Sequence, residues 1–478
     1  MIEIQVAGAG AGKTFGMAKK IIERFDPKSH KDIIAITYTN AAADNITDEL
    51  IKKIGFLPEN IKVCTVHTFL LNELIYPYSP AILNQVYTAS ARGTLSFAAK
   101  DGKPKTPVKL RQERAIIIKN LKSKEVIHVE DVFTVVRKIV DPDHSAHNTK
   151  AKKAKIGRIH RLLTSSIDKI FLDEAQDFDE TALKVFKAIG ENAVDIYMVG
   201  DPKQAIKHPG KFQEFLDKSD GNDKIKKLKP NNTSRRVPQN ILDLSNQFCP
   251  LGQEQTSLSD IEGRLSYVVS SDDGYDEFIA DHIEAKSLVS IYQKTGNYST
   301  RSTDAMPDIH PDVNELLIKH NIYIDRDLVI GAASHWLAAN ISQHSQYQVI
   351  SKFLKAFNIP NTTKTYAQLC DTIRRHDSSL ENTGKYRISS IWRTKGLESD
   401  VSILVLTQGI YKYLVKDKIE SDDEYNKIWN MVYVALTRSK SELVIAIDKA
   451  LFTGKPSVGD VINGIEALDF KRLDLRKV

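Results

Sequence analysis

The chain has 478 residues, a formal net charge of +6 and 41% hydrophobic residues. That length is more than one hydrophobic core usually serves, so two or more domains are expected, and the composition excludes a disordered or collagen-like protein. Its 3 cysteines lie far apart, no apolar run approaches the ~20 residues of a membrane span, and no basic-then-apolar leader opens the chain. We therefore expect a cytoplasmic protein without disulfides and without a membrane partner.

The chain opens with a short apolar strand pattern at 2–6, followed by AGAGAGKT and an amphipathic helix pattern at 15–25. Strand, small-residue turn and helix together are the context that a phosphate-binding P-loop requires. Lys13 would reach the β- and γ-phosphates of ATP, and the Thr14 hydroxyl would bind Mg²⁺. The backbone N–H groups expected to converge on phosphate oxygens are those of Ala9, Gly10, Ala11 and Gly12.

Further apolar strands, each with a polar motif at its end, follow the P-loop. Strands followed by helices are expected within the segments 32–50, 61–75, 165–178 and 192–206. Short apolar strands that alternate with helices predict a parallel sheet with helical crossovers. The polar motifs follow the carboxyl ends of these strands, which is where open α/β sheets bind ligands.

An acidic pair ends the apolar stretch of SSIDKIFLDEAQDF. Asp173 is expected to hold Mg²⁺ directly or through water, and Glu174 to orient and deprotonate the attacking water. Such a pair alone usually marks a solvated turn. An acidic pair that ends an apolar strand downstream of a P-loop instead favours a hydrolytic site.

The segment between His67 and Asp173 has a helical pattern and two basic runs. The first run contains Lys100, Lys103, Lys105, Lys109, Arg111 and Arg114. The second contains Lys150, Lys152, Lys153, Lys155, Arg158 and Arg161. One such run usually marks a solvated helical face. Two runs within one insertion of a nucleotide-hydrolysing core favour contact with a phosphate backbone.

A second α/β unit is expected from about residue 228. Strands are expected within 263–271, 327–333, 387–407 and 441–448. A helix is expected at 275–292, another after 333 and up to 357, and a flexible polar loop at 295–312.

Six motifs resemble those of the UvrD/Rep/PcrA family of superfamily 1 helicases, over residues 1 to about 448. They are AGAGAGKT, TYTNAAA, LDEAQD, VGDPKQAI, TKGLES and YVALTRSK. The resemblance implies an α/β fold with two RecA-like P-loop NTPase motor domains, a small mainly helical insertion, and ATP and Mg²⁺ as cofactors. The domains expected are motor domain 1A at 1–74 and 165–227, the basic insertion 1B at 75–164, and motor domain 2A at 228–478.

The same resemblance implies roles for residues that lie far apart in the sequence. Gln204 in GDPKQ resembles a γ-phosphate sensor, and Glu398 in KGLES resembles a ribose contact. Arg236 resembles a phosphate-contacting arginine, with Arg235 as the alternative, and Arg438 in YVALTRSK resembles a second arginine finger. Both arginines would reach across from the second domain to the phosphates, where a permanently charged fork suits phosphate oxygens.

The resemblance also implies contacts with single-stranded DNA. The matching positions are Tyr38, Thr39 and Asn40 of TYTNAAA, Thr65 and His67 of the next strand and helix, and Trp392 before TKGLES. An aromatic side chain in such a place can stack on a base. For Trp392, packing inside the protein is an equally good interpretation.

The chain departs from the family pattern in three places. No Gln-containing helix that reads adenine precedes the P-loop, and the segment after GDPKQ lacks the usual aromatic residues. The strand expected at 327–333 leaves only about 360–385 for the large 2B subdomain of the family. A 2B subdomain is therefore expected to be absent or rudimentary.

We expect an ATP hydrolase that acts as a 3′ to 5′ DNA helicase in repair, recombination or anti-phage defence. Its substrate would be single-stranded DNA or a 3′-tailed duplex. A compact chain of this kind resembles the Gabija-type defence helicases, which accompany a nuclease, so a nuclease or another DNA-processing protein is the expected partner. The alternatives are an RNA-directed superfamily 1 ATPase and a nucleotide-switched DNA-binding regulatory subunit of a nuclease complex.

Overall fold

The computed structural model describes residues 1–93, 95, 106–146, 149–293, 295, 297–300, 306–321, 324, 326–341, 344–380, 385–415 and 425–477. The chain divides into two compact units. The first comprises Met1–Val66, His160–Thr300 and Gly384–Val478, and the second comprises His67–Ile159 and Arg301–Thr383. Within the described residues, no helix has the length and apolar character needed to cross a membrane.

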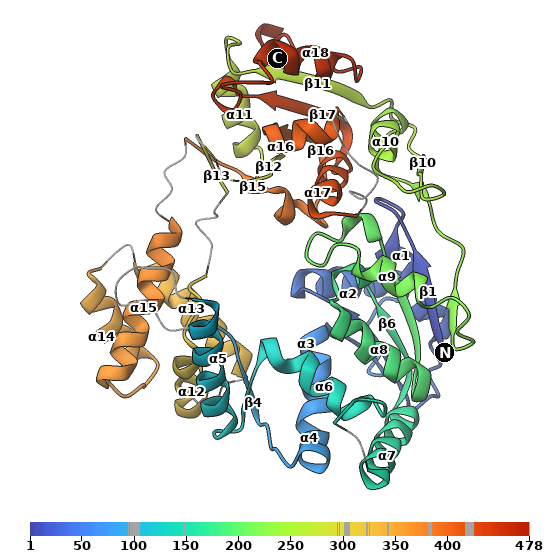
Figure 1. The fold of residues 1–478 in the computed structure, drawn as a ribbon, viewed down its shortest axis with the longest axis vertical. Coiled ribbons are helices and arrows are strands. Elements are labelled where there is room, and N and C mark those ends of the chain that lie inside the picture. Colours follow the sequence, from blue (N-terminus) through green and yellow to red (C-terminus); the bar gives the residue numbers. More distant parts are fainter. Residues whose placement is uncertain are drawn as a thin grey trace. The chain divides into compact units, whose positions relative to one another are not determined.

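A sheet of 6 parallel strands forms the first half of the first unit (Figure 1). In spatial order its strands are β3 (Ile61–Thr65), β2 (Asp32–Thr37), β6 (Ile167–Leu172), β7 (Asp195–Gly200), β1 (Ile2–Val6) and β8 (Ile225–Lys227). All these strands run the same way, so their carboxyl ends meet at one edge of the sheet. The P-loop, which follows β1, and the acidic pair, which follows β6, are thereby brought to the same edge.

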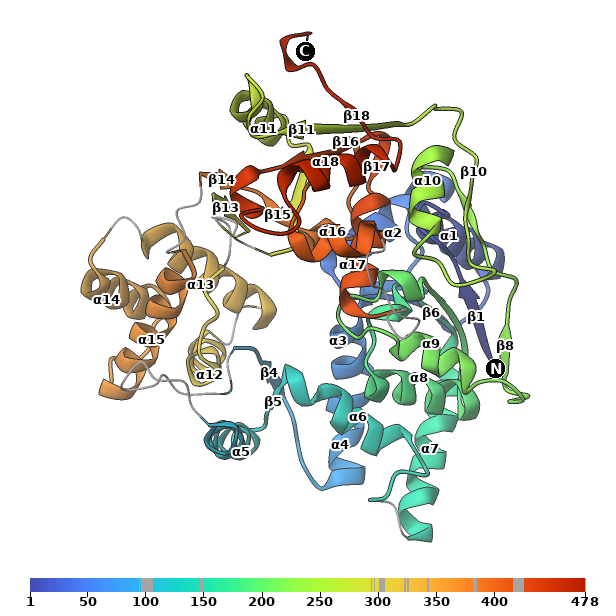
Figure 2. The same ribbon diagram turned by 45° about the horizontal axis from the view of Figure 1, so that its top comes forward.

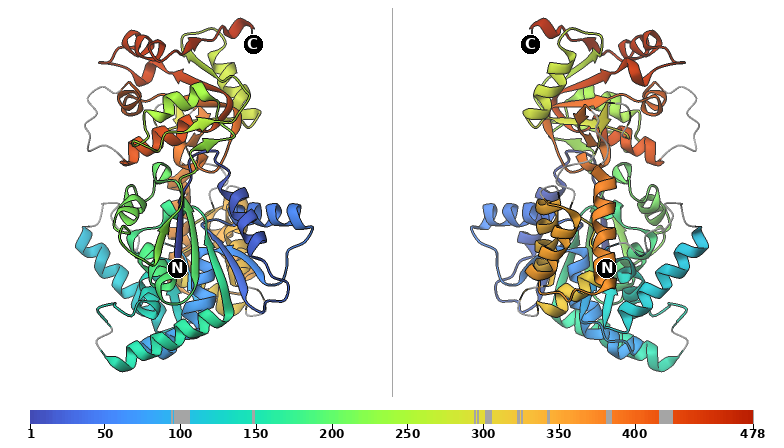
Figure 3. Two further views of the ribbon diagram at one scale, coloured as in Figure 1. Left: turned by 90° about the vertical axis from the view of Figure 1, so that its right-hand side faces the viewer. Right: turned by 90° about the vertical axis from the view of Figure 1, so that its left-hand side faces the viewer.

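Helices cover both faces of this sheet (Figure 3). They are α1 (Lys13–Arg24), α2 (Asn40–Ile54), α8 (Glu180–Asn192) and α9 (Lys211–Asp217). On one face, buried residues of α1 and α2 form an apolar cluster with Ala35, Phe171 and Val199 of the strands. Since α8 and α9 lie on the opposite face, the strands are apolar on both sides, as buried parallel strands are.

The second half of the first unit is another parallel sheet of 6 strands. Its spatial order is β15 (Ser389–Ser390), β12 (Leu288–Ile291), β16 (Ser399–Val405), β17 (Ser439–Ile447), β11 (Arg264–Val269) and β18 (Lys471–Arg472). Alternate residues of β17 enter two different apolar clusters: Leu443 and Ile445 enter one, and Val444 and Ala446 enter the other. Each face of this sheet therefore has its own core.

Helices and two small sheets complete the second half. The helices are α10 (Gln239–Asn246), α11 (Tyr275–Glu284), α16 (Gln408–Leu414), α17 (Lys427–Leu436) and α18 (Val458–Glu466). The two-stranded sheets pair β9 (Thr233–Ser234) with β10 (Thr256–Ser257), and β13 (Tyr298–Ser299) with β14 (Tyr386–Arg387). Two RecA-like α/β motor domains, as predicted from the sequence, are thus confirmed.

The second unit is mainly helical (Figure 2). Its elements from the earlier part of the chain are α3 (Val66–Phe69), a π-helical turn (Leu70–Ile75), α4 (Tyr76–Leu83), β4 (Ala89–Ala91), α5 (Pro107–Lys122), β5 (Val126–His128) and α6 (Val132–Val140). Helix α7 (Lys150–Ser166) then leads back into the first unit. Its later elements are α12 (Pro311–His320), α13 (Arg326–Ile341), α14 (Gln346–Ala356) and α15 (Thr363–Leu380).

The prediction of a strand at 327–333 is wrong, because this segment belongs to helix α13. Val329, Ala333 and Leu337, spaced by four residues, are all buried in one apolar cluster with residues of α12, α14 and α15. That spacing places the three side chains on one helical face. A short apolar run cannot be assigned to strand or helix by its hydrophobicity alone.

The helix expected at 275–292 is also too long. Helix α11 ends at Glu284, and Lys286 then has a left-handed backbone with a φ of 58°. The following residues form β12, which pairs with β15 and β16. Val289 and Ile291 are β-branched and buried, which suits a central strand better than a helix end.

Because 327–333 lies in a helix, the prediction that the 2B subdomain is absent or rudimentary loses its basis. That prediction counted 327–333 as part of the second motor sheet and left only about 360–385. The segment 311–380 instead supplies four helices with an apolar cluster of their own, and it is grouped with residues 67–159 and not with the motor sheets.

Candidate nucleotide and nucleic-acid site

The P-loop is a tight turn between β1 and α1. Gly10 and Gly12 have left-handed φ values of 68° and 71°, which glycine adopts without steric cost. Helix α1 begins at Lys13 with no side-chain cap and no acidic residue in its first turn. Its first N–H groups are thus left to an outside acceptor, and the helix dipole favours an anion there.

The loop leaves no room for a side chain at Gly10. An added Cβ at Gly10 would lie 2.4 Å from the Ser234 Oγ and 2.9 Å from the Arg236 Cβ. The Gly10 carbonyl accepts a hydrogen bond from the Arg235 N–H at 3.0 Å. The P-loop of the first sheet is therefore in direct contact with the segment that carries the predicted arginine.

Lys13, Thr14 and Asp173 lie together, as the sequence predicted. The Lys13 ammonium donates to the Ala7 and Gly8 carbonyls at 3.4 Å each, and the Thr14 hydroxyl donates to the Asp173 carboxylate at 3.4 Å. Burial, followed by repulsion from Glu174, raises the pKa of Asp173 to about 6. A buried carboxylate whose pKa is raised in this way is a natural ligand for a cation.

The oxygen groups of Thr14 and Asp173 fit Mg²⁺, which prefers oxygen ligands. Within the part of the chain that the structure describes, no three His, Cys, Asp or Glu side chains gather into a metal cluster. Mg²⁺ commonly uses one or two protein groups and completes its shell with water and substrate phosphates. The donor set therefore fits a metal that arrives with a nucleotide.

Glu174 is held in an unusual backbone conformation, with a φ of 53° and a ψ of 39°. Such left-handed geometry is uncommon for a residue other than glycine and is often found at functional sites. Burial alone would raise the pKa of Glu174, but the ammonium groups of Lys395 and Lys13 outweigh it and lower the pKa to about 2. Glu174 is therefore a carboxylate at neutral pH, which is the form a base needs.

Lys395 was not among the residues predicted for the site. Its ammonium lies 3.5 Å from the Glu174 carboxylate and 2.5 Å from the Asp177 carboxylate. It follows a short helical turn (Ile391–Thr394) of the second motor domain, so it joins the two domains at the acidic motif. The TKGLES motif contains this lysine, but the motif alone does not tell which acid it pairs with.

Gln204 lies beside the P-loop through its contact with Asp201. The Gln204 amide donates to the Asp201 carboxylate at 2.7 Å, and both side chains are almost fully buried. Burial would raise the pKa of Asp201, but Lys203 and Lys13 lower it below its usual value. Gln204 is thus fixed next to a carboxylate whose pKa is lowered.

The two predicted arginines lie close together. The Arg236 guanidinium donates to the Glu398 carboxylate at 3.0 Å, and its buried Nε has no hydrogen-bond partner among the described residues. Burial, followed by repulsion from Arg236, lowers the pKa of Arg438 to about 9. The side chain of the alternative candidate, Arg235, is exposed, so Arg236 is the better candidate.

Arg438 is held by groups at the end of α17. Its guanidinium donates to the carbonyls of Val434 at 2.8 Å and Leu397 at 3.2 Å, and to the Thr437 hydroxyl at 3.0 Å. Backbone carbonyls at a helix C-terminus stabilise a cation. The Glu398 carboxylate that pairs with Arg236 does not cancel the repulsion that Arg438 meets from Arg236, and a triphosphate would relieve it.

The predicted DNA-contacting residues have different surroundings. Tyr38 follows β2, is partly buried, and lies under the Lys207 ammonium, which is 4.8 Å from its ring centre. Thr39 caps α2 by accepting from the Ala42 N–H at 3.2 Å, and Asn40 is exposed at the start of that helix. These three residues extend the carboxyl edge of the sheet that carries the P-loop.

The remaining predicted contacts lie on other elements. Thr65 ends β3 in the first unit, whereas His67 belongs to the second unit, where its ring lies 5.6 Å from that of Phe133. Trp392 is 45% exposed, which favours a role at the surface over packing inside.

Both predicted basic runs contain exposed residues, which in the first run are Lys109 and Arg111. Lys100, Lys103 and Lys105 lie outside the described residues. Arg114 forms ion pairs with Glu130 and Asp131, which neutralise its charge. Along α7, exposed basic residues are Lys150, Lys152, Lys153, Lys155, Arg158 and Arg161.

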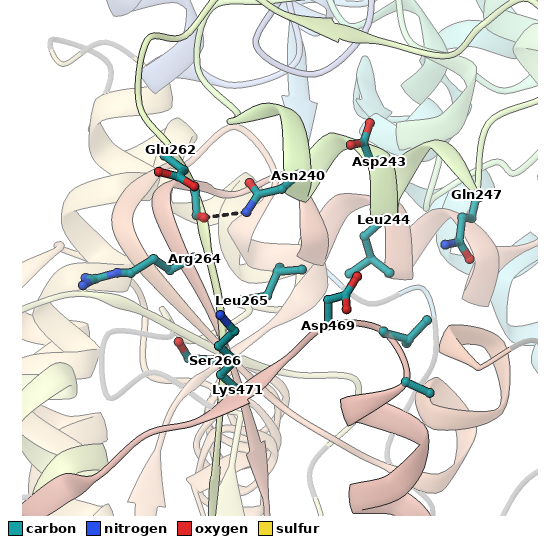
Figure 4. A pocket seen from close by; sticks show the side chains of 13 residues that line it. Asn240, Asp243, Leu244, Gln247, Glu262, Arg264, Leu265, Ser266, Asp469 and Lys471 are labelled. Atoms are coloured by element: carbon teal, nitrogen blue, oxygen red, sulfur yellow. Dashed lines mark hydrogen bonds between the residues drawn. The ribbon is translucent and has the colours of Figure 1, made fainter.

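A cavity of about 810 Å³ lies beside α10 and β11 in the second motor domain (Figure 4). Acidic and basic groups are mixed in its lining, which includes Asp243, Glu262, Asp469, Arg264 and Lys471. It contains none of the predicted site residues and is therefore distinct from the P-loop site.

The geometry defines a P-loop nucleoside triphosphatase of two RecA-like domains, in which the second domain brings cations to the phosphate loop of the first. Comparisons with known proteins agree with this class. Residues 2–209 match a family model described as an AAA domain, which includes the P-loop, the acidic pair and Gln204. The Gabija protein GajB of Bacillus cereus (strain VD045) is 22% identical over 508 residues, covering 94% of this chain and 93% of that protein.

A solved structure is described as a complex of Arterivirus nonstructural protein 10 (helicase) with DNA. It is 12% identical with a TM-score of 0.35, and the match covers 93% of this chain but only 59% of that one. So distant a likeness carries no argument here. The family model over residues 2–209 and the curated relative agree with an enzyme that hydrolyses ATP, and the ordered motifs resemble those of UvrD-like superfamily 1 helicases.

Proposed function

We propose that this enzyme is a cytoplasmic motor that translocates 3′ to 5′ along single-stranded DNA and serves in anti-phage defence beside a nuclease. The observation that carries the motor function is the contact between the two motor domains at the P-loop. Lys13 comes from the first sheet, and Arg236, Arg438 and Lys395 come from segments of the second half. Hydrolysis therefore depends on the approach of the two domains, which is what couples a chemical step to movement.

We assign the phosphates of ATP to the P-loop N–H groups of Gly10, Ala11 and Gly12 and to the Lys13 ammonium. The Ala9 N–H, also predicted to bind phosphate, donates in this structure to the Gln255 side-chain carbonyl at 3.1 Å. Thr14 and Asp173 would hold Mg²⁺, which supplies charge neutralisation on the phosphate oxygens when bound. Glu398 is assigned to the ribose. In the structure its carboxylate is paired with Arg236 and with Lys440.

Glu174 would orient the attacking water and take its proton. Because the Lys395 ammonium lies 3.5 Å away, this carboxylate is also stabilised by the second motor domain. Gln204 would respond to the terminal phosphate through its hydrogen bond with Asp201. Arg236 and Arg438 would neutralise the charge that develops when the terminal phosphate leaves.

The nucleic acid would run along the carboxyl edges of the motor sheets, where Tyr38, Thr39, Asn40 and Trp392 lie. Aromatic stacking and backbone contacts of this kind tolerate any base sequence. Thr65, at the end of β3, would add a further contact to the strand. His67 and the exposed basic residues of α7 are separate candidates for contact with nucleic acid. A motor that follows one strand needs such sequence-tolerant contacts.

The defence role and the nuclease partner rest on the relationship to the Gabija protein GajB, which spans nearly the whole of both chains. The substrate in that setting would be single-stranded DNA or a 3′-tailed duplex. Roles in repair or recombination use the same chemistry and differ only in the partner.

A streptavidin-displacement assay tests the proposed movement. The purified chain, with ATP and Mg²⁺, is incubated with oligonucleotides that carry biotin–streptavidin at either the 5′ or the 3′ end. Because a 3′ to 5′ motor pushes towards the 5′ end, streptavidin should be released from the 5′ end at least about tenfold faster than from the 3′ end. Faster release from the 3′ end would contradict the polarity, and release from RNA alone would support an RNA-directed ATPase. ATP hydrolysis without release would support a nucleotide-switched binding subunit.

A further inference from the structure

Gln255 is a buried residue that contacts the P-loop from the second half of the first unit. Its side-chain carbonyl accepts from the Ala9 N–H at 3.1 Å, and its amide donates to the Ala9 carbonyl at 2.9 Å. The side chain therefore binds both polar groups of one P-loop residue, as a neighbouring strand would. With only 1% of Gln255 exposed, water cannot replace these bonds without opening the site.

A second amide fixes the backbone of Gln255 in the same way. The Asn246 amide donates to the Gln255 carbonyl at 2.9 Å, and the Asn246 side-chain carbonyl accepts from the Gln255 N–H at 2.7 Å. Asn246 is the last residue of α10, whose apolar residues belong to the core of the second motor domain. Two successive pairs of hydrogen bonds thus connect that core to Ala9.

Gly8 allows this close approach. A Cβ at position 8 would lie 2.3 Å from the carboxamide carbon of Gln255 and 2.4 Å from its amide nitrogen. Real Cβ atoms are not found at such distances from other heavy atoms, so a side chain at position 8 would displace Gln255. Gly8 and Gln255 are therefore required together.

The connection continues from Gln255 to the predicted phosphate sensor. The Tyr433 hydroxyl contacts the Gln255 side-chain carbonyl at 2.5 Å and the Asp201 carboxylate at 3.2 Å, and it accepts from the Ala9 N–H at 3.2 Å. Asp201 in turn accepts from the Gln204 amide at 2.7 Å. Every side chain in this path is at least 97% buried, so the path is shielded from solvent.

We propose that Gln255 is a positioning residue for ATP hydrolysis, which sets the conformation of the P-loop from the second motor domain and links it to Gln204. The inference rests on the ATPase activity proposed above. Lys13 and the N-terminus of α1 do not depend on Gln255, so ATP can still bind when Gln255 is changed. When Gln255 is changed, the P-loop is no longer aligned with Gln204. This alignment stabilises the transition state of hydrolysis, so its loss slows the chemical step.

The test compares steady-state ATP hydrolysis by the full chain and its Gln255→Ala variant, at saturating single-stranded DNA and Mg²⁺. We expect kcat to fall about 10- to 100-fold, since a misplacement of ~1 Å near a reacting centre can cost that much. KM for ATP should stay within about threefold, because ground-state binding is retained. Gln247→Ala is the matched control: the residue type is the same, the position is nearby, and the side chain is exposed. Its kcat should equal that of the parent.

A variant pair separates positioning from general loss of structure. Gly8→Ala alone should lower kcat, because the new Cβ displaces Gln255. Adding Gln255→Ala removes the clash, so the double variant should be no slower than Gln255→Ala alone, within about twofold. If kcat of the double variant falls by the product of the two single losses, Gly8 and Gln255 act independently, and the inference is overturned. If Gln255→Ala does not fold, Asn246→Ala, which releases the Gln255 backbone, should lower kcat in the same direction.

A kcat and KM within twofold of the parent for folded Gln255→Ala would also overturn the inference. So would a drop in melting temperature with no change in kcat, because that marks a purely structural residue. An inactive parent chain, by contrast, would count against the proposed function itself.

Discussion

Replacing Arg236 by alanine is expected to lower ATP turnover by about 10³-fold or more, the range that arginine fingers contribute in related phosphoryl-transfer systems. The physical reason is charge, since a guanidinium that neutralises the leaving phosphate in a buried site cannot be replaced by water. The Arg236 Nε is buried without a hydrogen-bond partner among the described residues, so the side chain has a polar group ready for a ligand. Turnover is measured under saturating ATP, Mg²⁺ and single-stranded DNA.

Arg235→Ala is the control for Arg236→Ala. Arg235 is next in sequence and equally charged, but its side chain is exposed and only its backbone N–H contacts the P-loop. Its loss should change turnover by less than about threefold. If instead Arg235→Ala abolishes turnover and Arg236→Ala does not, the two assignments must be exchanged.

Replacing Glu174 by glutamine should lower turnover by about 10² to 10⁴-fold, the usual contribution of a general base, and leave ATP binding nearly unchanged. Glutamine keeps the shape of the side chain but cannot take a proton from water. The loss of one negative charge beside Lys395 and Lys13 favours binding of an anionic ligand, so weaker binding is not expected. Equilibrium binding of a fluorescent ATP analogue and single-turnover hydrolysis separate the two steps.

Glu180→Gln provides the matched control for Glu174→Gln. Glu180 follows the acidic motif in the sequence, begins α8, is exposed, and pairs with Lys184. Its variant should hydrolyse ATP at the parental rate. A parental rate for Glu174→Gln as well would remove Glu174 from the mechanism.

The P-loop and the acidic pair could be predicted from the sequence because each consists of a short run of consecutive residues. The P-loop turn follows from small residues between a strand and a helix, and the 3.4 Å contact between Thr14 and Asp173 follows from two parallel strands that end at the same edge. Parallel pairing of buried strands fixes where such motifs meet, even when 159 residues separate the two side chains. The alternation of apolar strands and helices therefore predicted the first sheet, and the motifs that follow its strands predicted the edge at which they meet.

The contacts between the domains could not be predicted in the same way. Gln255 belongs to no motif, and its role depends on the Asn246 amide and on the space left by Gly8. Lys395 lies in a recognisable motif, but its pairing with Glu174 and Asp177 depends on how two domains pack. Side chains that connect separate cores carry no periodic signal in the sequence.

Helix α13 shows a different limit. Its segment contains a short apolar run that fits a buried strand as well as it fits a helix. Only the helical neighbours that bury Val329, Ala333 and Leu337 decide between the two. The wrong assignment of 327–333 to a strand was enough to hide the group of helices α12 to α15 from the predicted domain organisation.

ATP turnover with and without single-stranded DNA tests most directly whether this chain couples ATP hydrolysis to that DNA. The parent chain and its Lys13→Ala variant are compared with a long oligonucleotide, with RNA of the same sequence, and without nucleic acid. We predict that DNA stimulates the parent at least about tenfold, as expected when strand binding helps to close the domains around the triphosphate. The Lys13→Ala variant, which lacks the phosphate-facing cation, should show no turnover above background. Parental turnover that is the same with and without DNA would contradict the coupling of ATP hydrolysis to single-stranded DNA.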